Sequence, residues 1–145
     1  MLKFNLETDG GGRLSSADLR GTRTVLYFYP KDDTSGCTLE AHEFTKLLPK
    51  FKKAGVQVIG VSPDSSKSHD KFVDKCNIGF TLLSDPDKLL CTAFDVWKEK
   101  SMYGRKYMGV ERSTFVIGPT GKIEHEWRKV KVPGHAREVL DKVNS

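Results

Sequence analysis

Residues 27–44 read YFYPKDDTSGCTLEAHEF, and they join the pattern of a strand to the pattern of a helix across one short polar loop. The aromatic and apolar start is typical of a buried strand, and Pro30 ends it. Beyond the loop, apolar residues recur at steps of four and three, as on one face of an α-helix: Cys37, Ala41, Phe44, Leu48 and Phe51. The stretch therefore predicts a strand, a loop and a helix that begins near Cys37.

Cys37 is predicted to lie in or near the first turn of this helix, on its inward face. Thr34 or Ser35 is the expected N-cap. Unpaired backbone N–H groups gather at a helix N-terminus and the helix dipole favours negative charge there, so a thiol loses its proton more easily. The alternative is a buried cysteine that acts as a small apolar side chain. The strand, the proline, the hydroxyl-bearing loop and the helix start together favour a reactive thiol.

Strand and helix patterns also alternate outside this stretch. Predicted strands cover residues 24–29, 56–61, 80–83, 113–117 and 122–128, with an N-terminal β-hairpin formed by residues 4–6 and 13–15. Predicted helices cover residues 37–53, 67–76 and 88–94, and a last helix begins at Gly134. This order predicts an α/β fold of the thioredoxin-like kind, with a mixed central sheet flanked by helices. A length of 145 residues suits one domain, spanning residues 1–145.

Two segments interrupt these patterns. Pro49 lies inside the helix that follows Cys37 and cannot donate a hydrogen bond to the carbonyl of Thr45, so we expect a kink or an early end there. Residues 98–109 are polar and contain Gly104 and Gly109, and this composition predicts a loop.

The composition is that of an ordinary soluble globular protein, with 37% hydrophobic and 30% charged residues. No apolar run approaches the length needed to cross a membrane, so we expect no membrane association. The first residues, MLKFNLETDGGG, lack the basic start and long apolar run of a secretory signal. Three cysteines without C-x-x-C or zinc-site spacing fit free thiols in a reducing compartment, so the expected location is the cytoplasm.

The net charge is +5, from 24 basic and 19 acidic residues. Basic residues gather in residues 46–53, 98–105 and 128–131. This balance leaves open a binding module for nucleic acid or for an acidic protein. No zinc finger or RNA-binding signature accompanies it, so a solvated basic surface that binds no nucleic acid is the favoured interpretation.

The loop and the helix start match a known family pattern. Pro30, Thr34 and Cys37 in PKDDTSGC match the pattern P-x-x-x-T/S-x-x-C of peroxiredoxins. The wider block YFYPKDDTSGCTLEA resembles the PrxQ subfamily, also called bacterioferritin comigratory protein. Later segments resemble the same subfamily in order: GVSPDS (60–65), FTLLSDPD (80–87), YGRKYMGVERSTFVI (103–117) and WRKVKVPGHA (127–136). The resemblance covers nearly the whole chain.

The resemblance implies a thiol-dependent peroxidase in antioxidant defence, with Cys37 as its peroxidatic cysteine. The thiolate attacks the distal oxygen of hydrogen peroxide or of an organic hydroperoxide and becomes sulfenic acid. A thiol reductant then recycles it: thioredoxin, glutaredoxin or a small thiol. The sequence contains no metal, haem or nucleotide motif, so no metal or cofactor is expected, and the protein is expected to be a monomer.

The same resemblance implies roles for four neighbours of Cys37. Thr34 offers a hydroxyl to the thiolate and the peroxide, although it also suits a plain helix cap. Arg112, just before the strand STFVI, matches the family's active-site arginine and would hold the thiolate and polarise the O–O bond. Pro30, which has no N–H, would shield the cysteine from water. Glu40, one turn past Cys37, would pair with an arginine, and a solvated helix position is its alternative.

The sequence departs from the subfamily at the resolving cysteine. Many PrxQ proteins carry it five residues after the peroxidatic one, but His42 occupies that position here. Other members carry it in the helix after the second strand–helix unit, and that slot falls near Val73, one turn before Cys76. Cys76 is therefore the candidate resolving residue, if the helices unwind locally, while Cys91 is expected in the core. A one-cysteine route with an external thiol stays open beside a Cys37–Cys76 disulfide.

Two other functions stay open at this point. A redox sensor or chaperone of low turnover would use Cys37 on the same fold. A basic binding module would not need Cys37, and it would bind polyanions in a strongly salt-dependent way.

Overall fold

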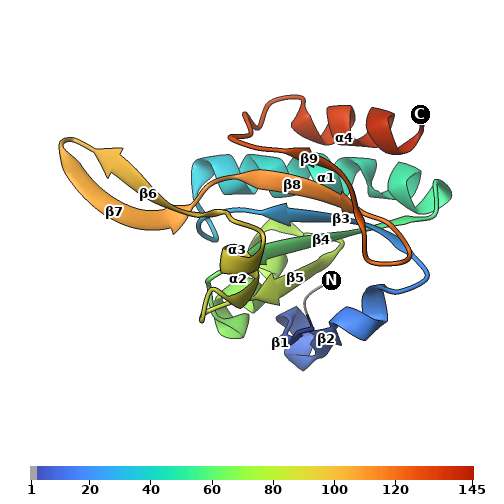
Figure 1. The fold of residues 1–145 in the computed structure, drawn as a ribbon, viewed down its shortest axis with the longest axis horizontal. Helices are drawn as coiled ribbons and strands as arrows, with labels where there is room; N and C mark the ends of the chain where they lie inside the picture. The colour runs from blue at the N-terminus through green and yellow to red at the C-terminus, as the bar shows by residue number, and fades with distance from the viewer. Residues whose placement is uncertain (1–2) are drawn as a thin grey trace.

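The computed structural model of the chain describes residues 3–145 (Figure 1). Its strands are β1 (Asn5–Glu7), β2 (Arg13–Ser15), β3 (Arg23–Phe28), β4 (Val56–Ser62), β5 (Thr81–Ser84), β6 (Trp97–Met102), β7 (Arg105–Val110), β8 (Ser113–Ile117) and β9 (Ile123–Trp127). Its helices are α1 (Ser35–Lys53), α2 (Ser66–Cys76), α3 (Leu89–Ala93) and α4 (His135–Val143), with short 3-10 turns at Asp9–Gly11 and Ser16–Leu19. Every predicted strand and helix is present, with ends that differ by one or two residues. None of the helices in residues 3–145 is both long and apolar enough to cross a membrane.

The centre of the fold is a five-stranded sheet in the order β5-β4-β3-β8-β9. β3, β4 and β5 run parallel, while β8 runs antiparallel to β3 and β9 antiparallel to β8. The parallel neighbours are connected through α1 and α2, because parallel strands need a crossover between them. The predicted mixed, helix-flanked sheet of the thioredoxin-like fold is confirmed, and so is the N-terminal hairpin β1–β2.

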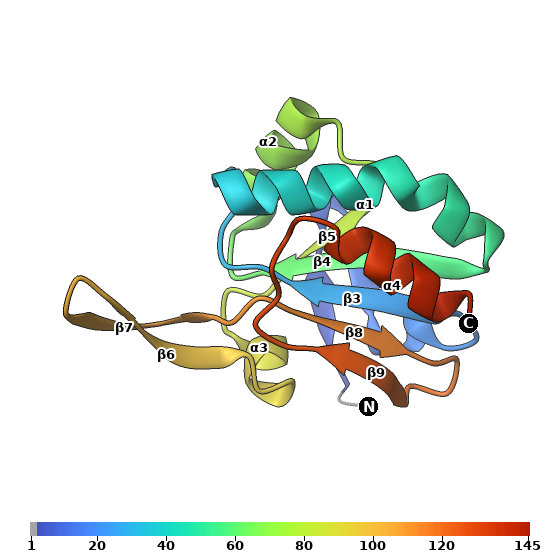
Figure 2. The ribbon, with the colours of Figure 1, turned by 90° about the horizontal axis from the view of Figure 1, so that it is seen from above.

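β3 lies in the middle of the sheet and is buried on both faces. Val25 and Tyr27 belong to one apolar cluster, and Leu26 and Phe28 belong to the other. Figure 2 shows α1 and α4 over the first face, while α3 packs on the opposite face. This central position explains the unbroken apolar run of β3 in the sequence. It also places the end of β3 directly before the N-terminus of α1.

Pro49 lies inside α1, and the helix continues past it to Lys53. Of the two alternatives expected at Pro49, a kink or an early end, the early end does not occur. Proline removes one hydrogen bond, to the carbonyl of Thr45, but Leu48 and Phe51 on either side of it are buried in the core and hold the last turns in place. Figure 2 shows the C-terminal end of α1 bending away from the line of its first turns, in keeping with the predicted kink.

The predicted loop at residues 98–109 is wrong, because these residues form most of a two-stranded antiparallel ribbon, β6–β7. Tyr103 and Gly104 both have positive φ, 52° and 76°, as the tight turn of a two-residue hairpin requires. The ribbon extends away from the main sheet (Figure 1), and most of its side chains are exposed. Except at its base, where Val110 is buried and Trp97 packs against the core, the ribbon has no core on either face, so its sequence lacks apolar alternation and resembles that of a loop.

Candidate active site

Cys37 lies in the first turn of α1, close behind the loop that follows β3. Thr34 is the N-cap, and its carbonyl accepts a hydrogen bond from the N–H of Thr38 at 2.8 Å. Cys37 is 1% exposed and belongs to the same core cluster as Tyr27 and Ala41. The helix start and the inward face are both as predicted, so the thiol lies where free N–H groups and the helix dipole favour an anion.

Arg112 comes from the short link between β7 and β8, far from Cys37 in the sequence. Its Nη2 donates a hydrogen bond to the Cys37 sulfur at 3.3 Å, and its Nη1 donates to Oε1 of Glu40 at 2.6 Å. Burial alone would lower the pKa of Arg112, but the neighbouring Glu40 and Cys37 outweigh it, so the pKa lies above its ordinary value. One guanidinium therefore touches the thiol and a carboxylate of the same helix.

Glu40 is buried, with 1% of the residue exposed. The alternative expectation, a solvated position on the helix surface, is therefore wrong. Its Oε1 pairs with Arg112, while its Oε2 has no hydrogen-bond partner among residues 3–145. Burial raises the pKa of the Glu40 carboxyl to about 7, and the Arg112 guanidinium acts in the opposite direction. The carboxyl therefore changes its charge in the neutral pH range, directly beside the group that contacts the thiol.

Gly36 allows Arg112 to come this close to the helix. A Cβ atom at position 36 would lie 3.3 Å from Nη2 of Arg112, which is tighter than nine in ten such contacts in proteins. No sequence pattern indicates this role, because the partner of the contact is distant in the chain. The glycine of the loop motif thus serves the approach of the guanidinium.

Thr34 and Pro30 flank the loop before Cys37. The Thr34 hydroxyl donates to the carbonyl of Lys31 at 3.0 Å, so its proton is not directed at the sulfur in this structure. In the described part of the chain, Thr34 therefore does not make the expected hydrogen bond to the Cys37 sulfur. Its position as the N-cap of α1 is as predicted. Pro30 lies between β3 and the loop and is half-buried.

The other two cysteines lie in different surroundings, and no disulfide joins any cysteine in the described part of the chain. Cys76 is the last residue of α2 and packs, half-buried, against the core cluster that contains Cys37. Cys91 in α3 is fully buried on the opposite face of the sheet, as expected for a core position. Burial and then the charge of Asp85 raise the pKa of the Cys91 thiol well above its ordinary value. His42 is exposed on α1.

A further cation near Cys37 comes from the ribbon β6–β7. Partial burial and then the charge of Arg112 lower the pKa of Lys100, while Cys37 acts in the opposite direction, so β6 lies within electrostatic range of the site. Because the polar composition of residues 98–109 favours a loop, Lys100 is not among the residues that the sequence predicts for the site. The sequence signal for this hairpin is weak, because only Gly104 of the turn pair is a residue type that favours positive φ, whereas Asn-Gly or Asp-Gly is typical of such a turn.

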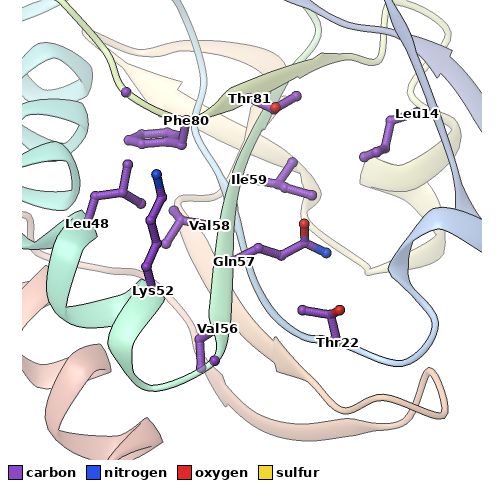
Figure 3. A pocket seen from close by; sticks show the side chains of 12 residues that line it. Leu14, Thr22, Leu48, Lys52, Val56, Gln57, Val58, Ile59, Phe80 and Thr81 are labelled. Carbon is purple, nitrogen blue, oxygen red and sulfur yellow. The ribbon is translucent and has the colours of Figure 1, made fainter.

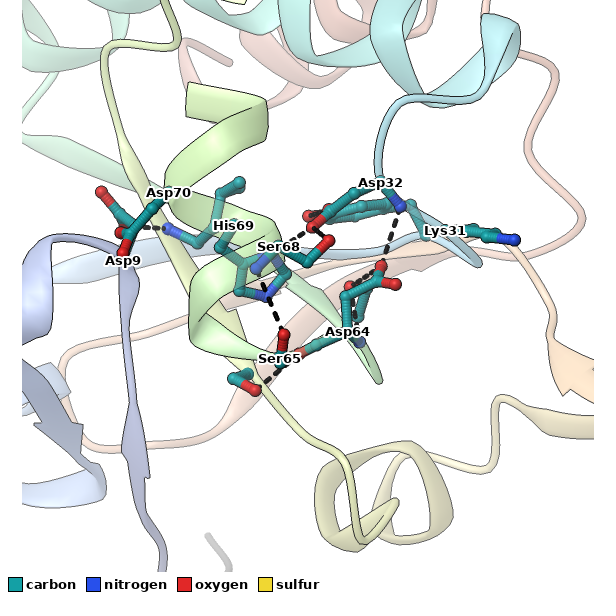
Figure 4. Close-up of polar contacts among 12 residues, drawn as sticks. Asp9, Lys31, Asp32, Asp64, Ser65, Ser68, His69 and Asp70 are labelled. Carbon is teal, nitrogen blue, oxygen red and sulfur yellow. Dashed lines mark hydrogen bonds and ion pairs between the residues drawn. The ribbon is translucent and has the colours of Figure 1, made fainter. Parts of the chain in front are cut away.

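A buried polar network holds the loop from its other side (Figure 4). Asp32 of the loop accepts hydrogen bonds from Tyr29 and Ser68, and its carboxylate lies 2.7 Å from Nδ1 of His69. The sequence does not predict this network, because Asp32 and His69 are 37 residues apart and belong to different elements. No periodicity in either segment points to the other.

The groove drawn in Figure 3 lies away from these residues. It is lined by β4, by the C-terminal part of α1 and by the chain before β5, and the Lys52 side chain extends toward Phe80 within it. Cys37, Glu40 and Arg112 are not among the residues that line it. The groove is therefore separate from the site around the thiol.

Comparison with known proteins agrees with the family pattern in the sequence. The chain matches the model of the AhpC/TSA family over residues 1–126. It is 53% identical over 135 residues to Peroxiredoxin Bcp of Xanthomonas campestris pv. campestris, a match that covers 93% of this chain and 84% of that protein. It is 49% identical over 137 residues to Peroxiredoxin Bcp of Bacillus subtilis, with 94% and 87% covered.

Solved structures show the same relationship. A structure of Peroxiredoxin Q from Xanthomonas campestris has a TM-score of 0.93 to this chain at 50% identity, covering 97% of this chain and 89% of that one. A structure of the Bacterioferritin Comigratory Protein of the same organism, described for its alkyl peroxide reduction activity, also has a TM-score of 0.93 and 50% identity, with 97% and 90% covered. These matches do not favour a basic binding module. The chain therefore belongs to the AhpC/TSA family and, within it, to the PrxQ/Bcp peroxiredoxins, which makes it a thiol-dependent peroxidase.

Proposed function

We propose that Cys37 is the peroxidatic cysteine of this peroxidase and that Arg112, Glu40, Thr34 and Pro30 shape its site. The observation that carries the proposal is one guanidinium that donates to the Cys37 sulfur at 3.3 Å and to Glu40 at 2.6 Å. A cation fixed in this way favours the thiolate, and it lies where negative charge develops during the reaction.

The first step transfers one oxygen atom from the hydroperoxide to sulfur. The Cys37 thiolate attacks the distal oxygen, an S–O bond forms, and the O–O bond breaks with its electron pair leaving on the proximal oxygen. The distal oxygen keeps its proton, so the product on sulfur is sulfenic acid. The proximal oxygen takes up a proton and leaves as water or as an alcohol. Sulfur is oxidised by two electrons, and Arg112 stabilises the charge on the oxygens.

Thr34 and Pro30 have supporting roles in this proposal. The Thr34 hydroxyl is bound to the carbonyl of Lys31 in the resting structure, and a rotation of the side chain would direct it toward an arriving peroxide oxygen. Pro30 occupies a half-buried position and has no N–H group to donate to water, which supports its role in shielding the helix start.

A thiol reductant returns Cys37 to its starting state. One thiol condenses with the sulfenic acid, releasing water and forming a disulfide. A second thiol then attacks the sulfur of the first, so that Cys37 leaves as its thiolate and the two reducing thiols end as a disulfide. The first thiol is either Cys76 or an external one, and thioredoxin, glutaredoxin or a small thiol is the reductant. Cys76 packs against the cluster that contains Cys37 but ends a different helix, so a direct bond requires the helix ends to move.

We place this activity in antioxidant defence, in a monomer of one domain in the cytoplasm. Both apolar clusters pack against the same sheet, which supports a single domain. Free cysteines suit a reducing compartment. Gel filtration of the reduced and of the oxidised protein tests the oligomeric state, and both forms should elute at the size of a monomer.

The test of the activity is peroxide consumption by the full chain with dithiothreitol as the reductant. Cys37→Ser should lose the reaction, whereas Cys91→Ala, which alters a buried thiol on the opposite face of the sheet, should keep it. Intact mass after one equivalent of hydrogen peroxide should show one added oxygen or one disulfide, and only when Cys37 is present. A Cys37→Ser protein that consumes peroxide at the wild-type rate would remove Cys37 from the mechanism.

A further inference from the structure

We propose that Asp32 and His69 form a positioning pair, in which an imidazolium holds an ionised carboxylate and thereby fixes the loop that leads to Cys37. Asp32 lies in the loop between β3 and α1, and His69 lies in α2. The pair acts through the loop on the position of the thiol. The inference rests on the proposed function of Cys37 and adds two residues to the machinery of the reaction.

Asp32 is only 7% exposed although it lies in a loop. Its Oδ1 accepts the hydroxyl proton of Tyr29 at 2.6 Å, and its Oδ2 accepts the hydroxyl proton of Ser68 at 2.8 Å. Burial raises the pKa of Tyr29 above its ordinary value, so this phenol keeps its proton and donates it. Donors on both oxygens stabilise the ionised form of a carboxyl group, so Asp32 is a buried anion.

His69 makes the third contact with this carboxylate. The residue is fully buried, with Nδ1 2.7 Å from Oδ2 of Asp32 and Nε2 3.1 Å from the carbonyl oxygen of Leu83. A backbone carbonyl only accepts, so Nε2 carries a proton. An ionised carboxylate also only accepts, so Nδ1 carries a proton as well. Neutral imidazole has a single N–H, and therefore both contacts together require the positively charged form.

The pair holds a short piece of chain in an uncommon conformation. Asp33, the next residue, has a φ of 60°, in the left-handed region that residues other than glycine seldom adopt. The N–H of Asp32 also donates to Oδ2 of Asp64 at 2.8 Å, just after β4 (Figure 4). Such a turn persists when its surroundings hold it on several sides. Here the surroundings are the end of β4 and the first half of α2.

The consequence for catalysis follows from the place of Asp32 in the chain. The loop passes from Asp32 directly to the N-cap Thr34 and the first turn of α1, which carries Cys37. A displacement of about 1 Å at a reacting group can cost about 10²-fold in rate. Since α2 also ends at Cys76, the same pair ties together the two segments that carry the peroxidatic and the candidate resolving cysteine.

Two substitutions separate the two contacts of the imidazole. His69→Asn places an amide N–H near the position of Nδ1 and keeps a donor to Asp32, whereas His69→Gln places one near Nε2 and keeps only the contact with Leu83. The second-order rate constant for hydrogen peroxide, measured by stopped flow well below the unfolding temperature, should fall at least about tenfold in His69→Gln and clearly less in His69→Asn. Asp70→Asn is the control, because Asp70 lies on the same helix but binds the N–H of Gly10 and should leave the rate unchanged.

Nitrogen NMR of the histidine side chains gives a readout that does not depend on activity. At about pH 7.5, where an ordinary exposed histidine is largely neutral, His69 should show two protonated ring nitrogens. Asp32→Asn should convert it to the form with one. If His69→Gln does not fold, Ser68→Ala is the alternative. It removes a neutral hydroxyl donor to Asp32 and should slow the reaction by a smaller factor than the one expected for His69→Gln.

Two results would overturn the pair: a neutral His69 in the wild-type protein, or equal peroxide rates in the wild type and both His69 variants. A wild-type protein whose Cys37 does not react with peroxide would instead contradict the proposed function, and the NMR result would still decide the charge of His69.

Discussion

The guanidinium of Arg112 lies 2.6 Å from the buried carboxylate of Glu40, although 72 residues separate the two along the chain. This contact occupies Nη1 and leaves Nη2 to donate to the sulfur of Cys37. A planar guanidinium makes both contacts at once, whereas a lysine ammonium is a point charge without this fork. Glu40 thus determines where the charge of Arg112 lies relative to the thiol.

Glu40→Gln should remove a pH-dependent part of the peroxide reaction. Burial raises the pKa of Glu40 to about 7, so the carboxyl gains its negative charge, and its full attraction for Arg112, as the pH rises through neutrality. The wild-type rate constant should therefore contain an upward step between about pH 6 and about pH 8 that the glutamine variant lacks. Stopped-flow rates across this range measure it, and identical profiles in both proteins would contradict the role of Glu40.

The same substitution should alter how stability depends on pH. The pKa of Glu40 is about 7 in the folded chain against an ordinary value of 4.5, so the folded chain binds the proton more tightly than the unfolded one. The free energy of unfolding that this proton contributes is fully present below the ordinary pKa and is lost as the pH rises through about 7. Urea denaturation should show that the wild type loses more stability across this interval than Glu40→Gln does.

Arg112→Ala should slow peroxide reduction by about 10²-fold to 10³-fold, because it removes the cation that contacts both the thiol and the developing charge. Arg112→Lys should restore only part of the rate, since an ammonium cannot hold Glu40 and the sulfur together. Arg137→Ala is the matched control, because Arg137 is exposed on α4 and pairs with Asp141. The unfolding temperature should change far less than the rate, since Glu40 can take up a proton when its partner is absent. An alanine variant within a few-fold of wild type would exclude this role for Arg112.

Gly36→Ala should separate stability from activity. Alanine is a better helix former than glycine by about 1 kcal/mol, so the unfolding temperature should stay equal or rise. The new Cβ would lie 3.3 Å from Nη2 of Arg112 and would push the guanidinium away from the sulfur, so the rate should fall by about tenfold. Ser35→Ala is the control in the same turn, at an exposed position. A Gly36→Ala protein with the wild-type rate would show that the close approach has no consequence.

Short-range signals explain why much of the fold can be predicted from the sequence. The unbroken apolar run of β3 predicts a strand buried on both faces, and the spacing of Cys37, Ala41 and Phe44 predicts the buried face of α1. Position 40 is different. It lies near the inward face of the helix, but its ion-pair partner Arg112 arrives from a distant link between strands, so no local pattern shows the pair.

Long-range contacts account for the features that the sequence does not predict. Beyond its base at Trp97 and Val110, the ribbon β6–β7 has neither face in the core, so its side chains follow no apolar period. Asp32 and His69 look like ordinary polar residues of a loop and a helix until the fold brings them within 2.7 Å. At Pro49 the sequence leaves a kink or an early end open, and the packing of buried neighbours decides between them, because the helix continues to Lys53 despite one lost hydrogen bond.

Resolution by Cys76 requires α1 to loosen during turnover. Cys37 is 1% exposed on the inward face of α1, and Cys76 is the last residue of a separate helix. Two thiols packed on separate elements seldom meet without movement of the backbone. The first turn of a helix has few hydrogen bonds to lose, and Gly36 lies within it. Oxidation should therefore unwind the first turn of α1, directly after Thr34, before the rest of the helix.

Cys76→Ser should then leave Cys37 as sulfenic acid or as more highly oxidised forms after peroxide treatment, while the wild type is partly protected by an internal disulfide. Protease cleavage within residues 38–46 should rise on oxidation of the wild type only. Cys91→Ala should behave like the wild type, because burial raises the pKa of the Cys91 thiol and keeps it protonated on the opposite face of the sheet. Mass spectrometry with disulfide mapping measures the first effect, and limited proteolysis measures the second. Equal overoxidation in wild type and Cys76→Ser, with unchanged cleavage, would remove Cys76 from the mechanism and leave the route through an external thiol.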